Sequence, residues 1–329
     1  MTADDGSHRV PQHHLVAGGG GFVGSHLVEL FLDRGDTATV VDNFVTGRRS
    51  NVAHLHGNDR FTLIEHDITQ PLPVSVTERT YDTVLDLASP ASPDDFKTMP
   101  LEILAVGSTG TRNLLDLARQ QQARFFLAST SEVYGDPLVH PQPETYWGNV
   151  SSTGPRSCYD EAKRFSEALA MAYHRTHGTE VRIARIFNTY GERMRPRDGR
   201  VVNTFVLQAL RNEPLTLHGD GSQTRSFCHV ADEIRGLAAV LDGHLTGPIN
   251  VGNPAEFTMR ELAELVVEIT GSTSPIIAVP LPDEREGDPL QRCPDIALLS
   301  TTYGWAPEVS LREGLARMVS WFTTKEDLT

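Results

Sequence analysis

The stretch that decides the fold is His14-Leu-Val-Ala-Gly-Gly-Gly-Gly-Phe-Val-Gly24. A short apolar run leads into glycines at every third position, and a helical pattern follows over Phe22–Arg34. The spaced glycines are Gly18, Gly21 and Gly24. Glycines at a strand-to-helix turn let the backbone approach a pyrophosphate closely, and the helix N-terminus behind them presents free N–H groups. The stretch therefore favours a dinucleotide-binding turn over a simple glycine-rich turn.

An acidic residue ends the next predicted strand, Thr37–Asp42. A carboxylate at this position hydrogen-bonds the adenosine ribose and repels a 2′-phosphate, so Asp42 favours NAD over NADP. Arg48 and Arg49 follow closely in the sequence and keep NADP as an alternative. Asp67 comes after the third predicted strand, where an adenine ring would lie, although it could equally cap a turn.

Strands and helices alternate through the first half of the chain, which is typical of βαβ units in a parallel sheet. The pattern predicts further strands at 61–66, 83–87, 125–129 and 181–187, and helices at 101–121 and 159–177. After Tyr190 the segments become shorter and bounded by proline, and residues 192–200 are expected to form a polar loop. The expected fold class is α/β, a Rossmann doubly wound parallel sheet with a smaller C-terminal substrate-binding lobe.

The expected domain organisation has three parts. Residues 1–12 form a disordered N-terminus, and residues 13–189 form an NAD-binding domain to which a segment at about 227–253 returns. Residues 190–226 and 254–329 form the substrate-binding lobe.

Composition limits the partners that this chain can have. The formal net charge of −14 argues against nucleic acid, although local arginines can still form an anion site. No apolar run is long enough to span a membrane, and residues 1–12 lack the apolar core of a signal peptide. Cys158, Cys228 and Cys293 lie far apart and show no metal-ligand spacing. We therefore expect a cytoplasmic protein with reduced thiols, no bound metal, and neither nucleic acid nor membrane as a partner.

Tyr159-Asp-Glu-Ala-Lys163 places a tyrosine and a lysine on one face of a predicted helix. Lowering the pKa of a phenol from about 10 to about 7 requires roughly 4 kcal/mol of stabilisation. A lysine ammonium one turn away and a positively charged nicotinamide ring both contribute to it. The tyrosinate can then accept the proton of a substrate hydroxyl as hydride leaves for the cofactor. The spacing is common by chance, but the chain has only the lysines Lys97, Lys163 and Lys325, so we interpret the pair as catalytic.

Hydroxyl side chains cluster at the end of the predicted strand before this helix, in Leu127-Ala-Ser-Thr-Ser-Glu-Val-Tyr-Gly135. At the carboxyl end of a parallel strand they would face the nicotinamide. Thr130 or Ser131 is expected to hydrogen-bond the reacting hydroxyl, although a single serine here could instead cap a helix.

These residues together resemble the extended short-chain dehydrogenases/reductases that act on nucleotide sugars, and within them the UDP-glucuronic acid decarboxylases. The resemblance runs from about His14 to Phe322. Its most specific segments are Val41-Asp-Asn-Phe44, Thr46-Gly47-Arg48, Leu87-Ala-Ser-Pro-Ala-Ser-Pro93, Ser129-Thr-Ser-Glu-Val-Tyr-Gly-Asp-Pro137, Tyr146-Trp-Gly148, Gly154-Pro-Arg156, Ala184-Arg-Ile-Phe-Asn-Thr-Tyr-Gly191, Asp198-Gly-Arg-Val-Val202, Gly221-Ser-Gln-Thr-Arg225 and Arg292-Cys-Pro-Asp295.

The resemblance implies a mechanism that the motifs alone do not. NAD would oxidise the C4 hydroxyl of UDP-glucuronate with Tyr159 as base, which creates a ketone β to the C6 carboxylate. Loss of carbon dioxide would leave an enolate, and protonation at C5 with return of the hydride would give the UDP-pentose UDP-xylose. The resemblance assigns Glu132 and Arg292 to the decarboxylation. On physical grounds, Arg292 can pair with the carboxylate, and we interpret Glu132 as opposing its charge.

The resemblance also completes the expected site. The catalytic residues would be Tyr159, Lys163, Thr130, Ser131, Glu132 and Arg292. The cofactor would be bound by Gly18, Gly21, Phe22, Val23, Gly24, Asp42, Asn43, Phe44, Thr46, Gly47, Asp67, Ile68, Leu87, Ala88, Ser89, Tyr159, Lys163 and Arg193. The substrate would be bound by Pro90, Ser92, Glu132, Arg156, Asn188, Arg200, Val202, Arg225 and Arg292. Arg195 and Arg197 are expected to be solvated, and no residue is expected to bind a metal.

The sequence departs from the family pattern within Leu104-Ala-Val-Gly-Ser-Thr-Gly-Thr-Arg-Asn113. Ala105 replaces a usual lysine and Gly107 a usual asparagine, both of which normally face the sugar or its acid group. The departure implies that some UDP-4-keto-pentose leaves together with NADH. The resemblance further implies a homodimer built from the helices near 101–121 and 159–177.

Three other functions remain as alternatives. A nucleotide-sugar 4,6-dehydratase would need an aspartate–glutamate pair where this chain has Ser131-Glu132. A 4-epimerase would have no use for Thr130-Ser131-Glu132 together with Arg292. A non-catalytic NAD-sensing protein would tend to lose Tyr159 or Lys163, and this chain keeps both.

Overall fold

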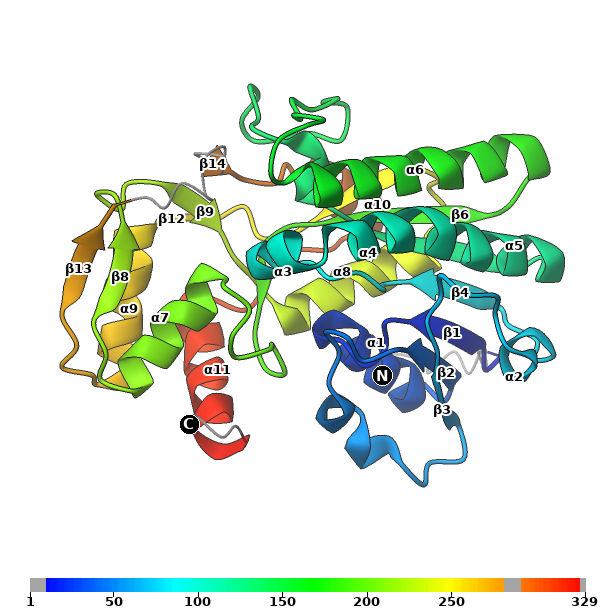
Figure 1. Cartoon of the computed structure of the whole chain (residues 1–329), viewed down its shortest axis with the longest axis horizontal. Coiled ribbons are helices and arrows are strands. Elements are labelled where there is room, and N and C mark those ends of the chain that lie inside the picture. The colour runs from blue at the N-terminus through cyan, green and yellow to red at the C-terminus, as the bar shows by residue number, and fades with distance from the viewer. Residues whose placement is uncertain (1–9, 281–290, 326–329) are drawn as a thin grey trace, which may run out of the picture.

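Apolar runs between His13 and Val251 form one seven-stranded parallel sheet (Figure 1). The computed structural model describes residues 10–280 and 291–325. In spatial order the strands are β3 (Phe61–Glu65), β2 (Thr37–Asp42), β1 (His13–Ala17), β4 (Thr83–Asp86), β5 (Arg124–Thr130), β6 (Val181–Ile186) and β11 (Pro248–Val251). The order 3-2-1-4-5-6 is that of a Rossmann sheet, here extended by β11. The predicted α/β fold class is confirmed.

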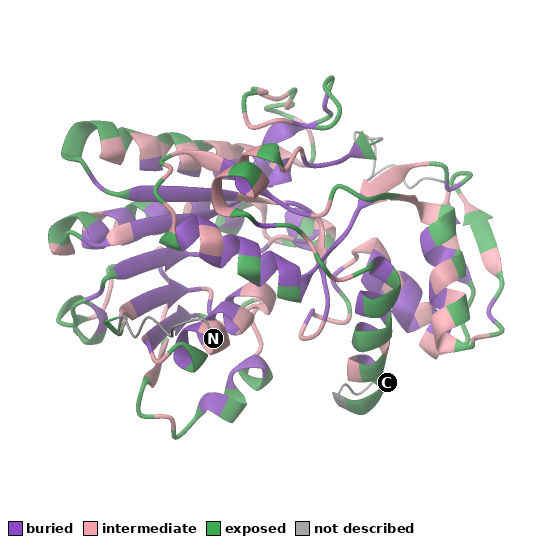
Figure 2. Cartoon of the chain, turned by 180° about the vertical axis from the view of Figure 1, so that it is seen from behind, coloured by how far each residue is buried: buried purple, intermediate pink, exposed green. Residues whose placement is uncertain are grey.

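Helices cover both faces of the sheet and bury it, which explains why its strands read as continuous apolar runs (Figure 2). Leu27 and Phe31 of one helix pack with Leu237 of another against Val40 on one face. Leu114 and other residues of the opposite layer pack against the second face. The helices are α1 (Phe22–Asp33), α2 (Val74–Thr77), α3 (Pro93–Thr98), α4 (Pro100–Ala105), α5 (Thr111–Gln121), α6 (Ser157–His177), α7 (Val201–Leu210), α8 (Val230–Asp242), α9 (Met259–Thr270), α10 (Ala297–Tyr303) and α11 (Leu311–Lys325). No helix in the described part of the chain is both long and apolar enough to cross a membrane.

The predicted helix at 101–121 is interrupted. Between α4 and α5 the residues Val106–Gly110 form a π-helical turn. The hydroxyl of Ser108 donates to the carbonyl of Leu104 at 2.6 Å, and Ser166 of α6 donates to the carbonyl of Gly107 at 2.7 Å. These side-chain bonds, together with the close approach of α6, replace part of the regular α-helical pattern.

A second core lies in a lobe at one end of the sheet, formed by α7, α9 and α11 with short strands (Figure 1). The short strands pair as β7 (Thr189–Tyr190) with β10 (Cys228–His229), β8 (Leu215–His218) with β13 (Ile276–Val279), and β9 (Thr224–Ser226) with both β12 (Glu256–Thr258) and β14 (Gln291–Arg292). Residues 191–200, between β7 and α7, form no helix or strand, as the polar loop predicts.

The ends of the chain lie partly outside the described residues. Of the predicted disordered start, residues 1–9 fall outside them. Gln12 already belongs to the fold, because its N–H donates to Asp36 Oδ1 at 2.9 Å and its carbonyl accepts from Thr37.

Candidate active site

One cavity of about 410 Å³ runs from the glycine turn, past α6, into the lobe. It lies at the carboxyl ends of the parallel strands, near β1 and β4, where the strand order reverses and open α/β sheets bind their ligands. Of the predicted site residues it is lined by Gly18, Gly21, Phe22, Val23, Gly24, Thr46, Leu87, Ser89, Ser92, Thr130, Ser131, Glu132, Arg156, Tyr159, Lys163, Asn188, Arg193, Arg200, Val202, Arg225 and Arg292. Residues predicted to bind the cofactor and residues predicted to bind the substrate therefore line one continuous space.

The glycine turn leaves no room for side chains. Gly18 has φ +80°, and a Cβ there would lie 2.7 Å from the backbone nitrogen of Ala88. A Cβ on Gly24 would lie 2.3 Å from the carbonyl oxygen of Gly18. Helix α1 starts directly behind, with no acidic residue in its first turn, so its N–H groups and positive dipole end face the cavity.

Arg193 lines the same part of the cavity and lies against α1. Its Nη2 pairs with Glu29 of α1, whereas its buried Nη1 donates no hydrogen bond to any described residue. A buried guanidinium N–H without a partner is costly unless a ligand satisfies it. A pyrophosphate between this arginine and the α1 N-terminus fits both groups.

The side chain of Asp42 stabilises the glycine turn and the segment after β2 by accepting backbone hydrogen bonds. Its Oδ2 accepts from the N–H of Gly20 and its Oδ1 from the N–H of Phe44, both at 2.8 Å. Burial raises the pKa of Asp42, and these two N–H donors offset part of that rise. The carboxylate is nearly covered, and Thr46 and Arg48 line the cavity beside it.

Several predicted cofactor or substrate residues do not line the cavity: Asp42, Asn43, Phe44, Gly47, Asp67, Ile68, Ala88 and Pro90. Asp67 accepts hydrogen bonds from both the N–H and the hydroxyl of Thr69 at 2.8 Å, which is the turn-capping role kept as its alternative. Ile68 is buried in the core beneath α5. Direct contact of these residues with a ligand stays a prediction.

Tyr159 and Lys163 lie one turn apart on α6, as their spacing predicts. The phenol ring stacks on Phe96 with ring centres 4.8 Å apart, and Lys163 Nζ lies 6.0 Å from the centre of the Tyr159 ring. Nζ donates to the carbonyl of Ala128 at 2.9 Å. Burial raises the pKa of Tyr159 to about 12, although a hydrogen bond with Thr130 opposes the rise. The ligand-free phenol is therefore protonated, and a further nearby cation is needed to make it a base at neutral pH.

Glu132 follows the carboxyl end of β5 and lies between two arginines. Its Oε1 pairs with Arg292 Nη1 at 2.7 Å and its Oε2 with Arg156 Nη2 at 2.6 Å. Burial favours the neutral acid, but the two guanidinium groups outweigh it and hold the pKa of Glu132 at about 2. Arg292 is 1% exposed and also donates to the carbonyl of Gly135 at 2.6 Å. Glu132, Arg156 and Arg292 together carry a net charge of +1, because one carboxylate pairs with two guanidinium groups.

Asp160 completes this cluster, and sequence reasoning missed it. It is 6% exposed, and its Oδ1 has no hydrogen-bond partner among the described residues. Burial, and then the negative charge of Glu132, raise the pKa of Asp160 to about 7. With Glu132, Arg156 and Arg292 it lines a second cavity of about 270 Å³. No spacing rule links Asp160 to Glu132, so only the folded chain reveals their proximity.

The lobe end of the cavity is rich in arginine. Arg200 donates to the carbonyl of Ala91 at 2.7 Å, and Arg225 to the carbonyl of Thr224 at 2.8 Å. The expectation that Arg195 is solvated is wrong: it donates to both Asp95 oxygens, at 2.8 and 3.0 Å, and lines the cavity. Arg197 is exposed, as expected.

Ala105 and Gly107 do not line the cavity, contrary to the expectation that they face the sugar. Gly107 is buried against α6, where a Cβ would lie 2.8 Å from the Cβ of Ala162. An asparagine therefore does not fit this backbone, and the glycine permits the close approach of the π-helical turn to α6.

Comparisons with known proteins agree with this geometry. A profile of the GDP-mannose 4,6-dehydratase family matches residues 15–318. UDP-glucuronic acid decarboxylase 1 of Arabidopsis thaliana is 53% identical over 311 residues, which cover 94% of this chain and 70% of that protein. The chain belongs to the UDP-glucuronic acid decarboxylase family of the extended short-chain dehydrogenases/reductases. UDP-glucuronic acid decarboxylase 1 of Danio rerio is 48% identical over 309 residues, covering 94% and 72% of the two chains.

Solved structures of family relatives have the same fold. The dTDP-glucose 4,6-dehydratase of Streptomyces venezuelae with bound NAD has a TM-score of 0.85 at 31% identity, covering 95% of this chain and 97% of that one. The UDP-glucuronic acid 4-epimerase of Bacillus cereus, in complex with UDP-glucuronic acid and NAD, has a TM-score of 0.84 at 28% identity, covering 94% and 99%. NAD bound in these relatives supports NAD as the cofactor of the family.

Proposed function

We propose that this protein converts UDP-glucuronate to UDP-xylose and carbon dioxide, with NAD recycled in each turnover. The observation that carries the proposal is the Glu132–Arg292 pair, buried in the same cavity as Tyr159 and the glycine turn. The hydride-transfer residues alone suit every nucleotide-sugar enzyme of this fold. A carboxylate clamped between two arginines suits a substrate that itself carries a carboxylate.

The cofactor subsite is assigned to the glycine turn with Arg193, which would hold the pyrophosphate of NAD. When bound, NAD would supply the hydride acceptor and a positive charge. Lys163 and that charge would lower the pKa of the Tyr159 phenol toward neutrality, because both cations stabilise the phenolate. Tyr159 then takes the proton of the C4 hydroxyl at its Oη, and the neighbouring Thr130 hydroxyl orients that group. Arg48 keeps NADP as the alternative cofactor.

The decarboxylation subsite is assigned to Glu132, Arg156 and Arg292. Its net charge of +1 attracts the C6 carboxylate of the substrate. Glu132 weakens that attraction, because its carboxylate already forms an ion pair with each of the two guanidinium groups. The carboxylate is therefore held but not strongly stabilised, and it leaves as carbon dioxide once the C4 ketone can accept the electron pair. Asp160, with a pKa of about 7, can take up or release a proton next to this cluster near neutral pH.

The nucleotide end is assigned to Asn188, Arg200 and Arg225, since guanidinium groups bind phosphate oxygens in pairs. Because Ala105 and Gly107 lie away from the cavity, their departure from the family pattern gives no structural reason for release of the 4-keto intermediate. We therefore propose UDP-xylose as the main product.

Product analysis tests this function directly. The purified protein is incubated with NAD and UDP-glucuronate, and nucleotide sugars are identified by nuclear magnetic resonance while carbon dioxide is trapped. UDP-xylose and carbon dioxide in equal amounts are expected. Formation of UDP-galacturonate without carbon dioxide would indicate a 4-epimerase, and UDP-4-keto-pentose with stoichiometric NADH would show that re-reduction fails. NAD binding with no turnover of UDP-glucuronate would favour the NAD-sensing alternative.

The proposed homodimer rests on apolar side chains left exposed along α4 and α6. Leu101 is 75%, Leu104 41% and Phe165 47% exposed, and α4 and α6 pack side by side. A second copy of the same helices would cover them in a four-helix interface. Light scattering should give a dimer for the wild type and a monomer for Phe165→Glu. Leu138→Glu, at an 81% exposed position outside both helices, should stay dimeric. A dimer for Phe165→Glu would place the interface elsewhere.

The cytoplasm is the proposed compartment. It is supported by Cys158, Cys228 and Cys293, which are all free and buried thiols, as a reducing environment favours.

A further inference from the structure

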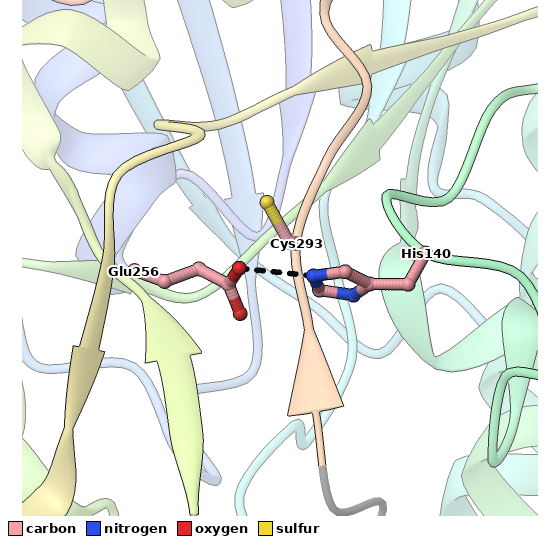
Figure 3. Close-up of side chains that lie close together, drawn as sticks. All are labelled: His140, Glu256 and Cys293. Atoms are coloured by element: carbon pink, nitrogen blue, oxygen red, sulfur yellow. Dashed lines mark hydrogen bonds and ion pairs between the residues drawn. The ribbon is translucent and has the colours of Figure 1, made fainter.

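Three metal-ligating side chains meet beside β14, outside the cavity described above (Figure 3). They are His140, Glu256 and Cys293, and their ligand atoms all lie within 4.8 Å of one another. They come from three segments: the loop before α6, the start of β12, and the residue directly after β14. We propose that His140, Glu256 and Cys293 form a binding site for a Zn²⁺-type transition-metal ion.

The donor set selects the metal. A thiolate with an imidazole and a carboxylate suits Zn²⁺ and Co²⁺, whereas Mg²⁺ and Ca²⁺ prefer oxygen ligands alone. Bound to one tetrahedral Zn²⁺, such donor atoms lie roughly 3–4 Å apart. The observed spacing therefore needs a contraction of at most about 2 Å, which the exposed side chains of His140 and Glu256 can supply by rotation. Water would fill the fourth position.

The surrounding contacts already orient the ligands. Glu256 Oε2 accepts from His140 Nε2, and its Oε1 accepts from the hydroxyl of Thr224, both at 2.9 Å. Buried Gln142 fixes the other two ligands relative to each other. Its backbone N–H donates to the carbonyl of Cys293, and its Oε1 accepts from the N–H of Cys293, both at 2.9 Å. Partners that hold ligands in place before binding are a regular feature of protein metal sites.

Without metal the thiol is protonated, because burial and the charge of Glu256 raise the pKa of Cys293 to about 12. Binding would break the S–H bond, form a metal–sulfur bond and release one proton to solvent. The ion would tie β12, β14 and the 138–142 loop together. Because Arg292 immediately precedes Cys293, the bound ion would also restrain the backbone of Arg292, whose guanidinium is buried.

Cobalt is the probe that tests the site. The full-length protein with bound NAD is freed of metal with a chelator, dialysed, and titrated with Co²⁺ while its absorption is recorded. One equivalent of Co²⁺ should give a thiolate-to-cobalt band in the near ultraviolet together with tetrahedral bands in the visible. Zn²⁺ should abolish these bands by displacing Co²⁺, because it binds such sites more tightly. Zn²⁺ should also raise the thermal unfolding temperature.

The variants decide which residues bind. Cys293→Ser should lose the near-ultraviolet band, and His140→Gln and Glu256→Gln should each weaken Co²⁺ binding by at least about 10-fold. Cys228→Ser and His244→Gln serve as matched controls, since they remove a buried thiol and a more accessible imidazole elsewhere, and both should bind as the wild type. His140→Gln alters an exposed side chain, so it keeps the test decisive even if Cys293→Ser fails to fold. Absence of the bands in the wild type, or their persistence in both Cys293→Ser and His140→Gln, would overturn the proposal.

Discussion

The exchange Glu132→Gln separates hydride transfer from decarboxylation. The arginine pairs lower the pKa of Glu132 from 4.5 to about 2, which corresponds to roughly 3 kcal/mol of favourable interaction with its carboxylate. A neutral amide at this position would lose that interaction and raise the net charge of the cluster with Arg156 and Arg292 from +1 to +2. The additional positive charge should bind the C6 carboxylate more tightly and oppose its departure. We expect a lower KM and a carbon dioxide release slowed up to about 100-fold, the rate equivalent of roughly 3 kcal/mol.

Stopped-flow absorbance at 340 nm reports the first NADH formation, and trapping of labelled carbon dioxide reports the second step. NADH formation should not slow, because the hydrogen bonds of the Glu132 side chain go to the arginines and not to the Tyr159–Lys163 pair. Removing the charge of Glu132 also removes one of the causes that raise the pKa of Tyr159. Glu161→Gln, a neutralised acid on α6 outside the cavity, is the matched control and should change neither step. Equal slowing of both steps, or a KM that rises, would refute the charge argument.

The pH dependence of stability gives an independent check on the same pair. A carboxyl whose folded-state pKa is depressed stabilises the fold above its unfolded-state pKa, and that stabilisation is lost as the pH falls through the folded-state value. The wild type should therefore exceed Glu132→Gln in unfolding free energy most at about pH 5 and above. The difference should shrink as the pH falls from 4.5 toward about 2.

Three further predictions concern other parts of the site. Asp160 has a raised pKa of about 7, so the wild type loses stability as the pH rises from 3.8 to that value. In denaturant unfolding, Asp160→Asn should therefore gain roughly 4 kcal/mol relative to the wild type over this pH range, and no gain would place the pKa of Asp160 near its ordinary value. Tyr159→Phe should slow NADH formation by about 10²–10⁴-fold while NAD titration by calorimetry stays unchanged, and rapid NADH formation would exclude Tyr159 as the base. Gly24→Ala puts a Cβ 2.3 Å from the carbonyl oxygen of Gly18 and should weaken NAD binding by at least about 10-fold. Gly271→Ala, with open space around its Cβ, should leave NAD binding unchanged. Equal NAD affinities of the two variants would show that the pyrophosphate does not bind at the glycine turn.

Local sequence patterns were enough to predict most strands and helices of the parallel-sheet domain. The strand Thr37–Asp42 is found at its predicted bounds, and the other predicted strands agree within a residue or two, because buried parallel strands leave continuous apolar runs. The glycine turn and the Tyr159–Lys163 pair were also accessible, since each depends on residues within one turn or one helix face. Identity to relatives then supplied residues such as Arg292 that no local rule connects to the site.

Contacts between distant segments could not be predicted in the same way. Arg195 was expected to be solvated because its loop is polar and arginine-rich, yet it meets Asp95 of α3 across the cavity. Gly107 was interpreted as a missing sugar contact, whereas its neighbour in space is Ala162. In both cases the partner lies far away in sequence, so the side chain's surroundings depend on how two elements pack. Asp160 shows the same limit, because its pKa is set by burial and by Glu132.

The pairing of β11 with β6 has a consequence for how the chain is made. β11 follows the first half of the lobe in the chain, so β6 stays an edge strand while residues 187–247 are being synthesised at about 5–20 residues per second. During those seconds Val181 and Ile183 belong to an apolar strand whose N–H and C=O groups can pair with another nascent chain. Chaperones that shield the β6 edge until Pro248–Val251 pairs with it should therefore raise soluble expression in a heterologous host.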